Sequence, residues 1–221
     1  MSINAEPLTI DVVSDVVCPW CFLGKKRLET ALRESGENVV VRWRPFQLDP
    51  SIPAEGVDRV AYMRKKFGDT GRIEAAHERL RALGAADGIA FDFARIARAP
   101  NTLDAHRLIR WAYGAGAQDR VVERLFQRYF VEGRDIGERD SLIETAAECG
   151  MDAELVGKLL DDGADVTEVR EEISQAQQIG VTGVPFYILG QRFGVSGAQE
   201  ASTLIEAIGK TREMMREAAH P

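Results

Sequence analysis

The side chains best suited to chemistry in this sequence are two cysteines, Cys18 and Cys21, in the stretch Cys-Pro-Trp-Cys. They follow the apolar run 8–13 and precede a segment with helical spacing, so a strand is expected to end and a helix to begin there. Two thiols at that separation can close a small disulfide ring, with the first sulfur facing solvent and the second covered by its own helix. Unpaired N–H groups and the positive end of the helix dipole favour a thiolate at Cys18. The spacing therefore predicts thiol–disulfide exchange through a redox-active Cys18–Cys21 disulfide.

Two other interpretations of the cysteine pair are a pair of small buried apolar residues and half of a zinc site. A structural zinc ion needs about four ligands. The other candidate ligands are Cys149, His77, His106 and His220, and none of them is paired at ligand spacing. The strand-to-helix setting near the start of an α/β chain favours the redox interpretation. We therefore predict no metal site.

Composition argues against several classes of partner. The 221 residues carry a net charge of −7, so no overall positive field would gather nucleic acid or anionic lipid. Residues 1–7 lack the basic and apolar regions of a secretory signal, and no apolar run approaches the ~20 residues of a membrane helix. Three cysteines, two of them in one motif, do not make a disulfide framework. We expect a cytoplasmic protein with no nucleic-acid or membrane partner, in which the cysteine disulfide is transient.

The amino-terminal part of the chain has a β-α-β pattern. Residues 8–13 are apolar with little alternation, which predicts a strand covered on both faces. A helix is expected over residues 21–34, with Gly36 as its stop. The valine-rich residues 39–43 then predict a second strand. A short helix between two strands indicates a parallel crossover.

Strand patterns return only near the carboxyl end. Residues 183–189 predict a strand entered through a proline, residues 190–191 a turn, and residues 192–195 the hairpin partner. Ser196 and Gln199 form a capping pair before a closing amphipathic helix. The end of the chain is therefore expected to fold as β-β-α.

Between these ends, residues 51–179 contain much helical periodicity and no convincing strand. Asn101 with Asp104 and Ser141 with Glu144 have the spacing of capping pairs at helix starts. The periodicity predicts seven helices, over residues 57–67, 73–83, 103–113, 121–130, 142–149, 153–160 and 166–179.

The order of these elements predicts an α/β fold. The β-α-β start and the β-β-α end make one four-stranded mixed sheet flanked by helices, with the helical block inserted between the two halves. We expect a discontinuous domain of residues 1–50 and 180–221 and a helical insertion of residues 51–179. The last helix of the insertion, at about 165–179, leads back into the sheet.

Four segments carry a resemblance to a known family. They are Ser-Asp-Val-Val-Cys-Pro-Trp-Cys-Phe-Leu-Gly at 14–24, Pro-Asn-Thr-Leu-Asp-Ala-His-Arg-Leu at 100–108, Gly-Val-Pro-Phe at 183–186 and Val-Ser-Gly-Ala-Gln at 195–199. The chain resembles DsbA-like oxidoreductases, which have a thioredoxin fold with a large all-helical insertion. Within them it is most similar to the FrnE-like branch, which is related to 2-hydroxychromene-2-carboxylate isomerase and kappa-class glutathione transferase.

The resemblance implies that Pro185 has a cis peptide bond and sits opposite the cysteine pair. An X-Pro bond can be cis at a cost of only ~0.5 to 1 kcal/mol. A cis bond turns the backbone of Val184 outward, where its N–H and C=O can pair with an extended segment of bound substrate. The alternative is a trans proline at the start of an edge strand. Near the cysteines, Pro19 fixes φ at a first helical position, and Trp20 adds apolar cover that could hold substrate.

Asn101 and His106 have structural interpretations as well as functional ones. Asn101 is first a helix cap. By analogy with relatives that bind small thiols, the same helix end could face the site, so Asn101 is also a candidate for substrate binding. His106 is expected to be a satisfied interior or boundary histidine.

The leading hypothesis is a cytoplasmic thiol–disulfide oxidoreductase in which Cys18 attacks and Cys21 resolves. Its substrates would be disulfide- or thiol-bearing proteins or small molecules, with a reducing or oxidising partner, no bound cofactor and glutathione as a candidate co-substrate. One alternative is a glutathione-dependent isomerase or transferase, but such relatives typically carry serine where this chain has Cys18, which favours redox chemistry. Another alternative is a non-enzymatic, chaperone-like binder. The relatives also imply a homodimer.

Overall fold

A computed structural model describes residues 6–68 and 70–219, which contain a mixed four-stranded sheet. β1 is parallel to β2 and antiparallel to β5, and β5 is antiparallel to β6. The order across the sheet is β2 (Val39–Pro45), β1 (Leu8–Ser14), β5 (Phe186–Leu189) and β6 (Phe193–Ser196). The predicted α/β fold with a four-stranded mixed sheet is confirmed.

β1 lies between β2 and β5, and its side chains are covered on both faces of the sheet. Ile10 and Val12 belong to the main core on one face, whereas Val13 packs with Phe46 and Val181 on the other. Since β1 is paired on both sides, the position of its last residue is fixed, and the cysteine pair follows directly from this end of the sheet.

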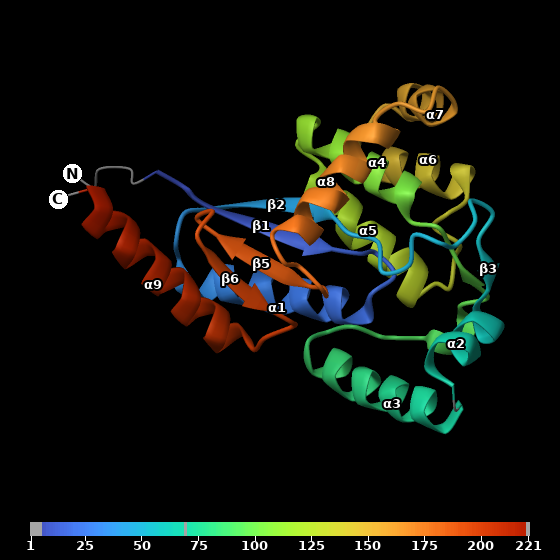
Figure 1. Ribbon diagram of the computed structural model, residues 1–221, viewed down its shortest axis with the longest axis horizontal. Coiled ribbons are helices and arrows are strands. Elements are labelled where there is room, and N and C mark those ends of the chain that lie inside the picture. Colours follow the sequence, from blue (N-terminus) through green and yellow to red (C-terminus); the bar gives the residue numbers. More distant parts are fainter. Residues whose placement is uncertain (1–5, 69, 220–221) are drawn as a thin grey trace.

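α1 (Pro19–Ser35) and α9 (Ala201–Ala219) lie side by side on one face of the sheet (Figure 1). α1 begins two residues before the expected residue 21, because the fixed φ of Pro19 suits the first helical turn. It ends where expected: Gly36 has φ 62°, the left-handed conformation that glycine adopts without a steric cost.

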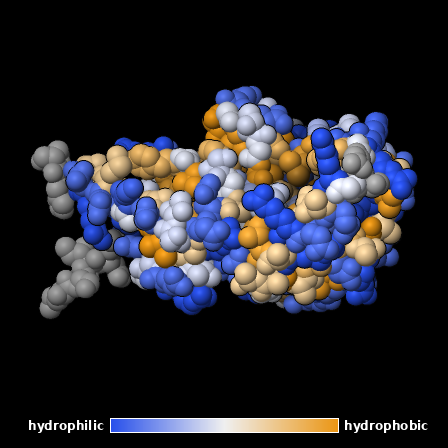
Figure 2. All heavy atoms as spheres, turned by 90° about the horizontal axis from the view of Figure 1, so that it is seen from below, coloured by the Kyte–Doolittle hydropathy of each residue, from blue (hydrophilic) through white to orange (hydrophobic). Residues whose placement is uncertain are grey.

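All seven helices expected between the halves of the sheet are present, with shifted ends. Figure 1 shows α4 and α8 on one side of the sheet and α1 on the other, with α2 and α3 next to the amino-terminal end of α1. α5 contacts both α1 and β2. The bounds of the seven helices are α2 (Arg59–Phe67), α3 (Thr70–Ala86), α4 (Leu103–Gly114), α5 (Gln118–Phe130), α6 (Arg139–Glu148), α7 (Ala153–Asp161) and α8 (Val166–Gln178). Among the described residues, no helix is long and apolar enough to cross a membrane. The face of the molecule in Figure 2 carries both hydrophilic and apolar residues.

The expectation of no strand between the halves was wrong. β3 (Val57–Asp58) and β4 (Arg98–Ala99) form a short antiparallel pair. The helix expected from residue 57 therefore begins at Arg59, because the Asp58 carboxylate accepts the Ala61 amide at 2.8 Å and caps it.

One predicted capping pair was wrong and one was right in part. α6 begins at Arg139, so Ser141 lies inside the helix and is buried, and Glu144 instead pairs with Arg128 at 3.1 Å. Thr102, not Asn101, is the residue directly before α4, but the Asn101 side-chain oxygen still accepts the amide of Leu103, the first residue of the helix, at 2.9 Å. The contact of Glu144 with buried Arg128 on the neighbouring helix explains why Ser141 and Glu144 do not cap α6, and such a contact cannot be seen in local sequence spacing.

The closing hairpin is shorter than expected at its start. β5 begins at Phe186, and residues 183–185 precede it as bends. Gly190 and Gln191 make the predicted turn, with φ of 56° and 59°. The expected capping pair of Ser196 and Gln199 was wrong, because Ser196 ends β6 and α9 begins only at Ala201. The Gln199 side chain instead donates to the Ser196 carbonyl at 2.7 Å.

The sheet half and the helical half share one core. Phe22 of α1 stacks on Phe126 of α5 at 5.0 Å and meets Phe91 edge-on at 5.8 Å. The domain boundaries expected at 50/51 and 179/180 stay a prediction. Because aromatic rings interlock across the two halves, the amino-terminal end of α1 is held firmly against the helical segment.

Candidate active site

Cys18 is the last residue before α1 and sits at the end of the turn that follows β1. Its carbonyl oxygen accepts the Cys21 amide at 3.0 Å, and its own amide donates to the Asp15 carbonyl at 3.0 Å. The expectation that the Cys18 sulfur faces solvent was wrong: the residue is only 4% exposed and borders a cavity instead. Its sulfur lies 3.6 Å from the carbonyl oxygen of Val184, a residue that is 166 positions away in the chain. The fold therefore joins the two sequence motifs at the sulfur atom.

Cys21 lies behind Cys18, one turn into α1, and has no exposed surface. The two thiols are not joined by a disulfide. Burial raises the pKa of the Cys21 thiol well above its usual value, and hydrogen bonding with Cys18 and the charge of Cys18 raise it further. Ser14 and the Asp15 backbone lower this pKa, but by less. Cys21 is therefore held in the protonated form.

Pro185 lies opposite the cysteine pair, and the Val184–Pro185 peptide bond is cis. The Pro185 carbonyl accepts the Gly197 amide at 2.8 Å, which ties this loop to the end of β6. On the other side, the ring of Pro185 packs against Gly24 of α1. The backbone of Val184 is thereby fixed beside the Cys18 sulfur.

A cavity of about 590 Å³ opens beside Cys18. Four of the predicted site residues line it: Cys18, Pro19, Trp20 and Val184. Cys21 and Pro185 lie behind this wall and do not line the cavity. The cavity joins the start of α1 and the loop before β5 to the helical segment.

Asn101 does not line the cavity, although its neighbours Pro100 and Thr102 do. Its side-chain N–H donates to the Ile52 carbonyl at 2.6 Å, and its oxygen accepts both the Leu103 amide and a Gln47 side-chain N–H at 3.0 Å. These hydrogen bonds link the Asn101 side chain to Gln47, to Ile52 and to the start of α4. A substrate contact by Asn101 stays a prediction.

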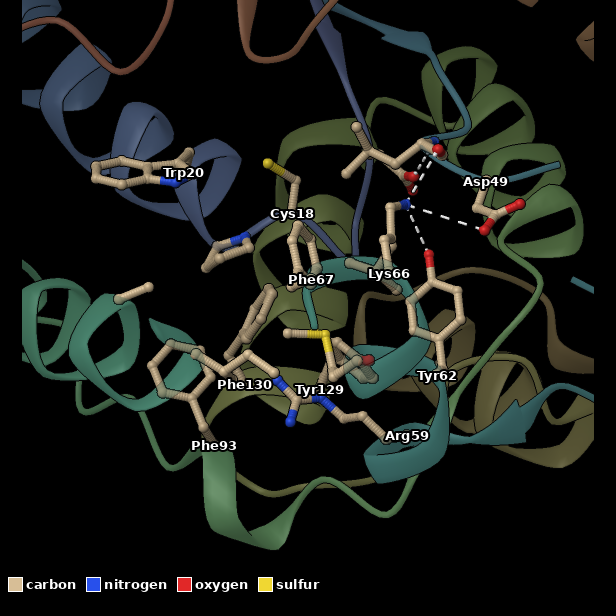
Figure 3. Close-up of a pocket in the computed structure, with 18 of the residues that line it drawn as sticks. Cys18, Trp20, Asp49, Arg59, Tyr62, Lys66, Phe67, Phe93, Tyr129 and Phe130 are labelled. Atoms are coloured by element: carbon tan, nitrogen blue, oxygen red, sulfur yellow. Dashed lines mark hydrogen bonds and ion pairs between the residues drawn. The ribbon is translucent and has the colours of Figure 1, made fainter. Parts of the chain in front are cut away.

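The far wall of the cavity comes from residues that sequence reasoning missed. Figure 3 shows Arg59, Tyr62, Lys66 and Phe67 reaching from α2 into the pocket. Further wall residues come from α3 and α5 and from the loop before β4: Ile73, His77, Leu80, Phe93, Tyr129 and Phe130. No local motif marks them, because only the packing of α2 and α3 against the start of α1 brings them to Cys18.

Charged groups on the wall are held by specific partners. Lys66 donates to the Tyr62 hydroxyl at 2.7 Å and forms an ion pair with Asp49 at 3.9 Å (Figure 3). Arg59 approaches the His77 ring nitrogen Nε2 at 3.4 Å. Burial lowers the pKa of His77, and the charge of Arg59 lowers it further, so this ring is neutral.

His106 is an interior histidine, as expected. Its Nε2 lies 2.8 Å from the Phe46 carbonyl oxygen and 3.4 Å from the buried Asp15 carboxylate. A ring N–H that donates to this carbonyl satisfies the side chain. Among the residues that the structure describes, no group of three or more His, Cys, Asp or Glu side chains is arranged to hold a metal ion.

Comparisons with known proteins agree with this arrangement. The sequence model of the DSBA-like thioredoxin domain family matches residues 9–209. YwbO of Bacillus subtilis (strain 168), an uncharacterized protein, is 31% identical over 182 residues, which cover 82% of this chain and 86% of YwbO. The crystal structure of a probable DsbA oxidoreductase from Streptomyces coelicolor is 32% identical, with a TM-score of 0.84 over 93% of this chain and 90% of that chain. The structure of the cytosolic disulfide reductase DsbM from Pseudomonas aeruginosa with GSH shares the fold, with 20% identity and a TM-score of 0.61 over 96% of this chain and 100% of that chain.

Proposed function

We propose, from the premise that this chain belongs to the DSBA-like thioredoxin domain family, that it is a thiol–disulfide oxidoreductase of the FrnE-like branch acting through Cys18 and Cys21. The observation that carries the proposal is the placement of the two sulfurs. The Cys18 sulfur lies 3.6 Å from the Val184 carbonyl oxygen at the cavity wall, while Cys21 is buried behind it. Two-step exchange requires one sulfur that attacks the substrate and a second, shielded sulfur that later attacks the mixed disulfide.

In the first step, the Cys18 thiolate attacks one sulfur of a substrate disulfide. The bond between Cys18 and the substrate forms as the substrate S–S bond breaks, and one substrate thiolate leaves. Cys21 then loses its proton and attacks the Cys18 sulfur, which releases the second substrate thiolate and forms the Cys18–Cys21 disulfide. The substrate gains the two electrons that the enzyme dithiol loses. A thiol donor returns the enzyme to the dithiol by the same chemistry.

The groups around Cys18 are proposed to hold the substrate during this exchange. The backbone of Val184 faces the sulfur from the loop before β5, where it can pair with an extended segment of substrate. Pro185 fixes that backbone from behind, and Trp20 offers an apolar wall. Pro19 is the first residue of α1, where its missing N–H costs no hydrogen bond, so the helix begins directly beside the reacting sulfur.

The proposed setting is a reducing cytoplasm, where reductase or isomerase work is the natural direction. Glutathione is the proposed co-substrate that regenerates the dithiol. This proposal is supported by analogy with DsbM, a cytosolic disulfide reductase of the same fold whose structure was solved with GSH. A homodimer and a dedicated redox partner stay predictions.

A glutathione-dependent isomerase or transferase is a second candidate, because a cavity of about 590 Å³ lies beside the Cys18 sulfur and can take an organic substrate. Such an activity would need glutathione bound but no cycling of the cysteine pair. Retention on immobilised glutathione, together with activity that survives Cys21→Ser, would favour it. The chaperone-like alternative would instead survive loss of both thiols, measured as suppression of aggregation by Cys18→Ser/Cys21→Ser.

The deciding experiment is reduction of insulin and of glutathione disulfide by the protein with a dithiol donor. We expect Cys18→Ser to abolish both reactions, because it removes the attacking sulfur. Cys21→Ser should instead accumulate a mixed disulfide at Cys18, visible by intact mass under non-reducing conditions. Cys149→Ser serves as the matched control, since this buried thiol does not line the cavity. Equal residual activity in the two active-site variants would contradict the assigned roles.

A further inference from the structure

The cavity beside Cys18 has an apolar wall with a cation far from the sulfur. Figure 3 shows Cys18 at one side of the pocket and the side chain of Arg59 at the other, with Phe67, Tyr129 and Phe130 between them in the view. The volume of about 590 Å³ falls within the range of roughly 300–1,000 Å³ that encloses small organic ligands. The pocket is thus the size of a compact molecule.

Arg59 is held in a defined orientation by aromatic neighbours. Its guanidinium carbon lies 6.0 Å from the ring centre of Phe93, and Phe93 stacks on His77 at 4.2 Å. The neutral His77 ring accepts an Arg59 N–H at Nε2, 3.4 Å from the donor nitrogen. The charge of Arg59 also acts on the buried hydroxyl of Tyr129, where it lowers the pKa that burial raises.

The described part of the chain supplies Arg59 with no carboxylate counter-ion. Within residues 6–68 and 70–219, no carboxylate forms an ion pair with it at 4.0 Å or less. By contrast, Lys66 on the same helix has Asp49. A half-buried guanidinium without an anion carries an uncompensated desolvation cost, which an anionic group on a ligand would offset.

The route to the Cys18 sulfur also favours a small substrate. Met63 of α2 and Ile73 of α3 stand in the cavity wall, and Arg79 of α3 lies over the Trp20 ring at 5.8 Å. With Cys18 only 4% exposed, a partner must enter the cavity to reach the sulfur.

We propose that the substrate is a small thiol or disulfide compound with an apolar, ring-sized body and an anionic group, which places its sulfur at Cys18 and its anion at Arg59. The proposal rests on the function proposed above for its sulfur chemistry. In its disulfide form the compound takes up the two electrons of the Cys18–Cys21 dithiol and leaves as two thiols. Recognition by Arg59 does not depend on redox chemistry and is tested separately.

The binding test uses 2-naphthoate and its neutral counterpart 2-naphthamide, neither of which can exchange sulfur. Binding is followed by calorimetry and by tryptophan fluorescence, because Trp20 lines the cavity. We expect Arg59→Gln to weaken naphthoate binding about tenfold, the effect of one charge-assisted hydrogen bond, and to leave naphthamide unchanged. Arg59→Lys should recover part of the loss, which also shows that the cavity is intact.

Arg64→Gln is the matched control for binding, because Arg64 is an exposed cation on the same helix and does not line the cavity. It should leave both ligands unaffected. Equal weakening of naphthoate by Arg64→Gln and Arg59→Gln would overturn the proposal, since a general field would then explain the effect. Equal affinity of the wild-type protein for naphthoate and naphthamide would also overturn it.

The reaction test mixes the reduced protein with three disulfides and follows oxidation of the cysteine pair. They are 5,5′-dithiobis(2-nitrobenzoate), which is aromatic and anionic, 2,2′-dithiodipyridine, which is aromatic and neutral, and insulin. We expect Arg59→Gln to slow the first about tenfold and to spare the second. Insulin reacting faster than both aromatic disulfides would overturn the small-substrate proposal while leaving the oxidoreductase function intact. No oxidation of the pair by any of the three disulfides would overturn the function itself, and with it the sulfur placement.

Discussion

Cys18 lies directly before α1 and Cys21 lies in its first turn, yet their surroundings are different. Cys18 borders the cavity, whereas Cys21 is enclosed by its own helix and by the sheet. Burial is the largest cause of the raised pKa of Cys21, and the neighbouring Cys18 adds to it. A sulfur that stays protonated does not compete for substrate. Burial therefore assigns the order of attack without any additional residue.

This order of attack predicts how resolution depends on pH. The rate of release from a Cys18 mixed disulfide should rise about tenfold per pH unit from about pH 6 to 8, because only the Cys21 thiolate attacks and this range lies below its raised pKa. The sign follows from the direction of the shift: a higher thiol pKa means less thiolate at neutral pH. A mixed disulfide with 2-nitro-5-thiobenzoate, formed at low pH and then jumped to higher pH, gives the rate by absorbance. Cys21→Ser should show no release, and a rate that is flat above pH 6 would contradict the prediction.

Two buried tyrosines differ in whether their hydroxyl groups have partners. The Tyr187 hydroxyl has no hydrogen-bond partner among the residues that the structure describes, and burial raises its pKa. The Tyr129 hydroxyl donates to the Arg98 carbonyl at 3.2 Å. We expect Tyr187→Phe to raise the free energy of unfolding by about 1 kcal/mol and Tyr129→Phe to lower it by about the same amount. Urea unfolding measures both, and a loss of stability in Tyr187→Phe would mean that its hydroxyl has a partner after all.

At the scale of elements, the site depends on how closely the loop before β5 approaches α1. Gly24 lies one turn beyond Cys21, and a side-chain carbon there would overlap the Tyr187 hydroxyl and touch the Pro185 ring. Only a residue without Cβ lets the loop reach the start of α1. This close approach is what places the Val184 carbonyl beside the Cys18 sulfur.

Gly24→Ala should therefore destabilise the protein although alanine favours helices. The helix-propensity gain is about 1 kcal/mol, and overpacking costs about 1–3 kcal/mol, so we expect a net loss of about 1 kcal/mol together with slower disulfide exchange. Gly209→Ala in α9 is the control, because no atom of residues 6–68 and 70–219 lies within 4 Å of its added carbon. It should gain up to about 1 kcal/mol and keep full exchange activity. Urea unfolding and insulin reduction measure the two effects, and equal stabilisation of both variants would contradict the close-contact argument.

The elements were predictable where the signal was local. The apolar run before Cys18, the proline after it and the turn at Gly190 each carry their own pattern, and the four-stranded mixed sheet followed from them. Prediction failed where a helix start depends on a residue far away in the sequence. Buried Arg128 of α5 contacts Ser141 and Glu144, and α6 begins at Arg139, before both of them. The cavity wall was missed for the same reason.

Within that wall, α2 and α3 were expected as helices, but their register against Cys18 is set by tertiary packing. Arg59 is the clearest example, since in the sequence it is one of many surface-like arginines. Only its position against His77 and Phe93, and the absence of an ion-pair partner among the described residues, distinguish it. Asn101 shows the converse. Its motif suggested a place in the substrate site, but its side chain bonds to the Ile52 carbonyl and to the first amide of α4 instead.

At the scale of the whole molecule, a buried lysine joins the sheet half to the helical half. Lys25 of α1 lies over the Trp43 ring of β2 and forms ion pairs with Glu29 of its own helix and with Asp119 and Glu123 of α5. Burial alone would lower the pKa of Lys25, but these three carboxylates outweigh it and the pKa is raised. The ammonium group is therefore charged where the two halves meet.

Lys25→Met tests whether this junction makes the two halves unfold together. The side chain of Lys25 is 1% exposed and that of Lys26 is 21% exposed, yet both pair with Glu29 and Glu123. Because the abandoned carboxylates of α5 can partly rehydrate, we expect Lys25→Met to cost about 2 kcal/mol of unfolding free energy, below the range for a fully buried pair. Lys26→Met should cost less than about 1 kcal/mol.

The same variants report on cooperativity. If Lys25 couples the halves, Lys25→Met should also separate the unfolding transitions seen by tryptophan fluorescence and by circular dichroism, which should coincide in the wild-type protein and in Lys26→Met. A similar loss of stability in both variants, with coincident transitions, would show that the shared aromatic core around Phe22 and Phe126 holds the halves together without the buried charge. The position of α1, and with it of Cys18, would then depend on apolar packing alone.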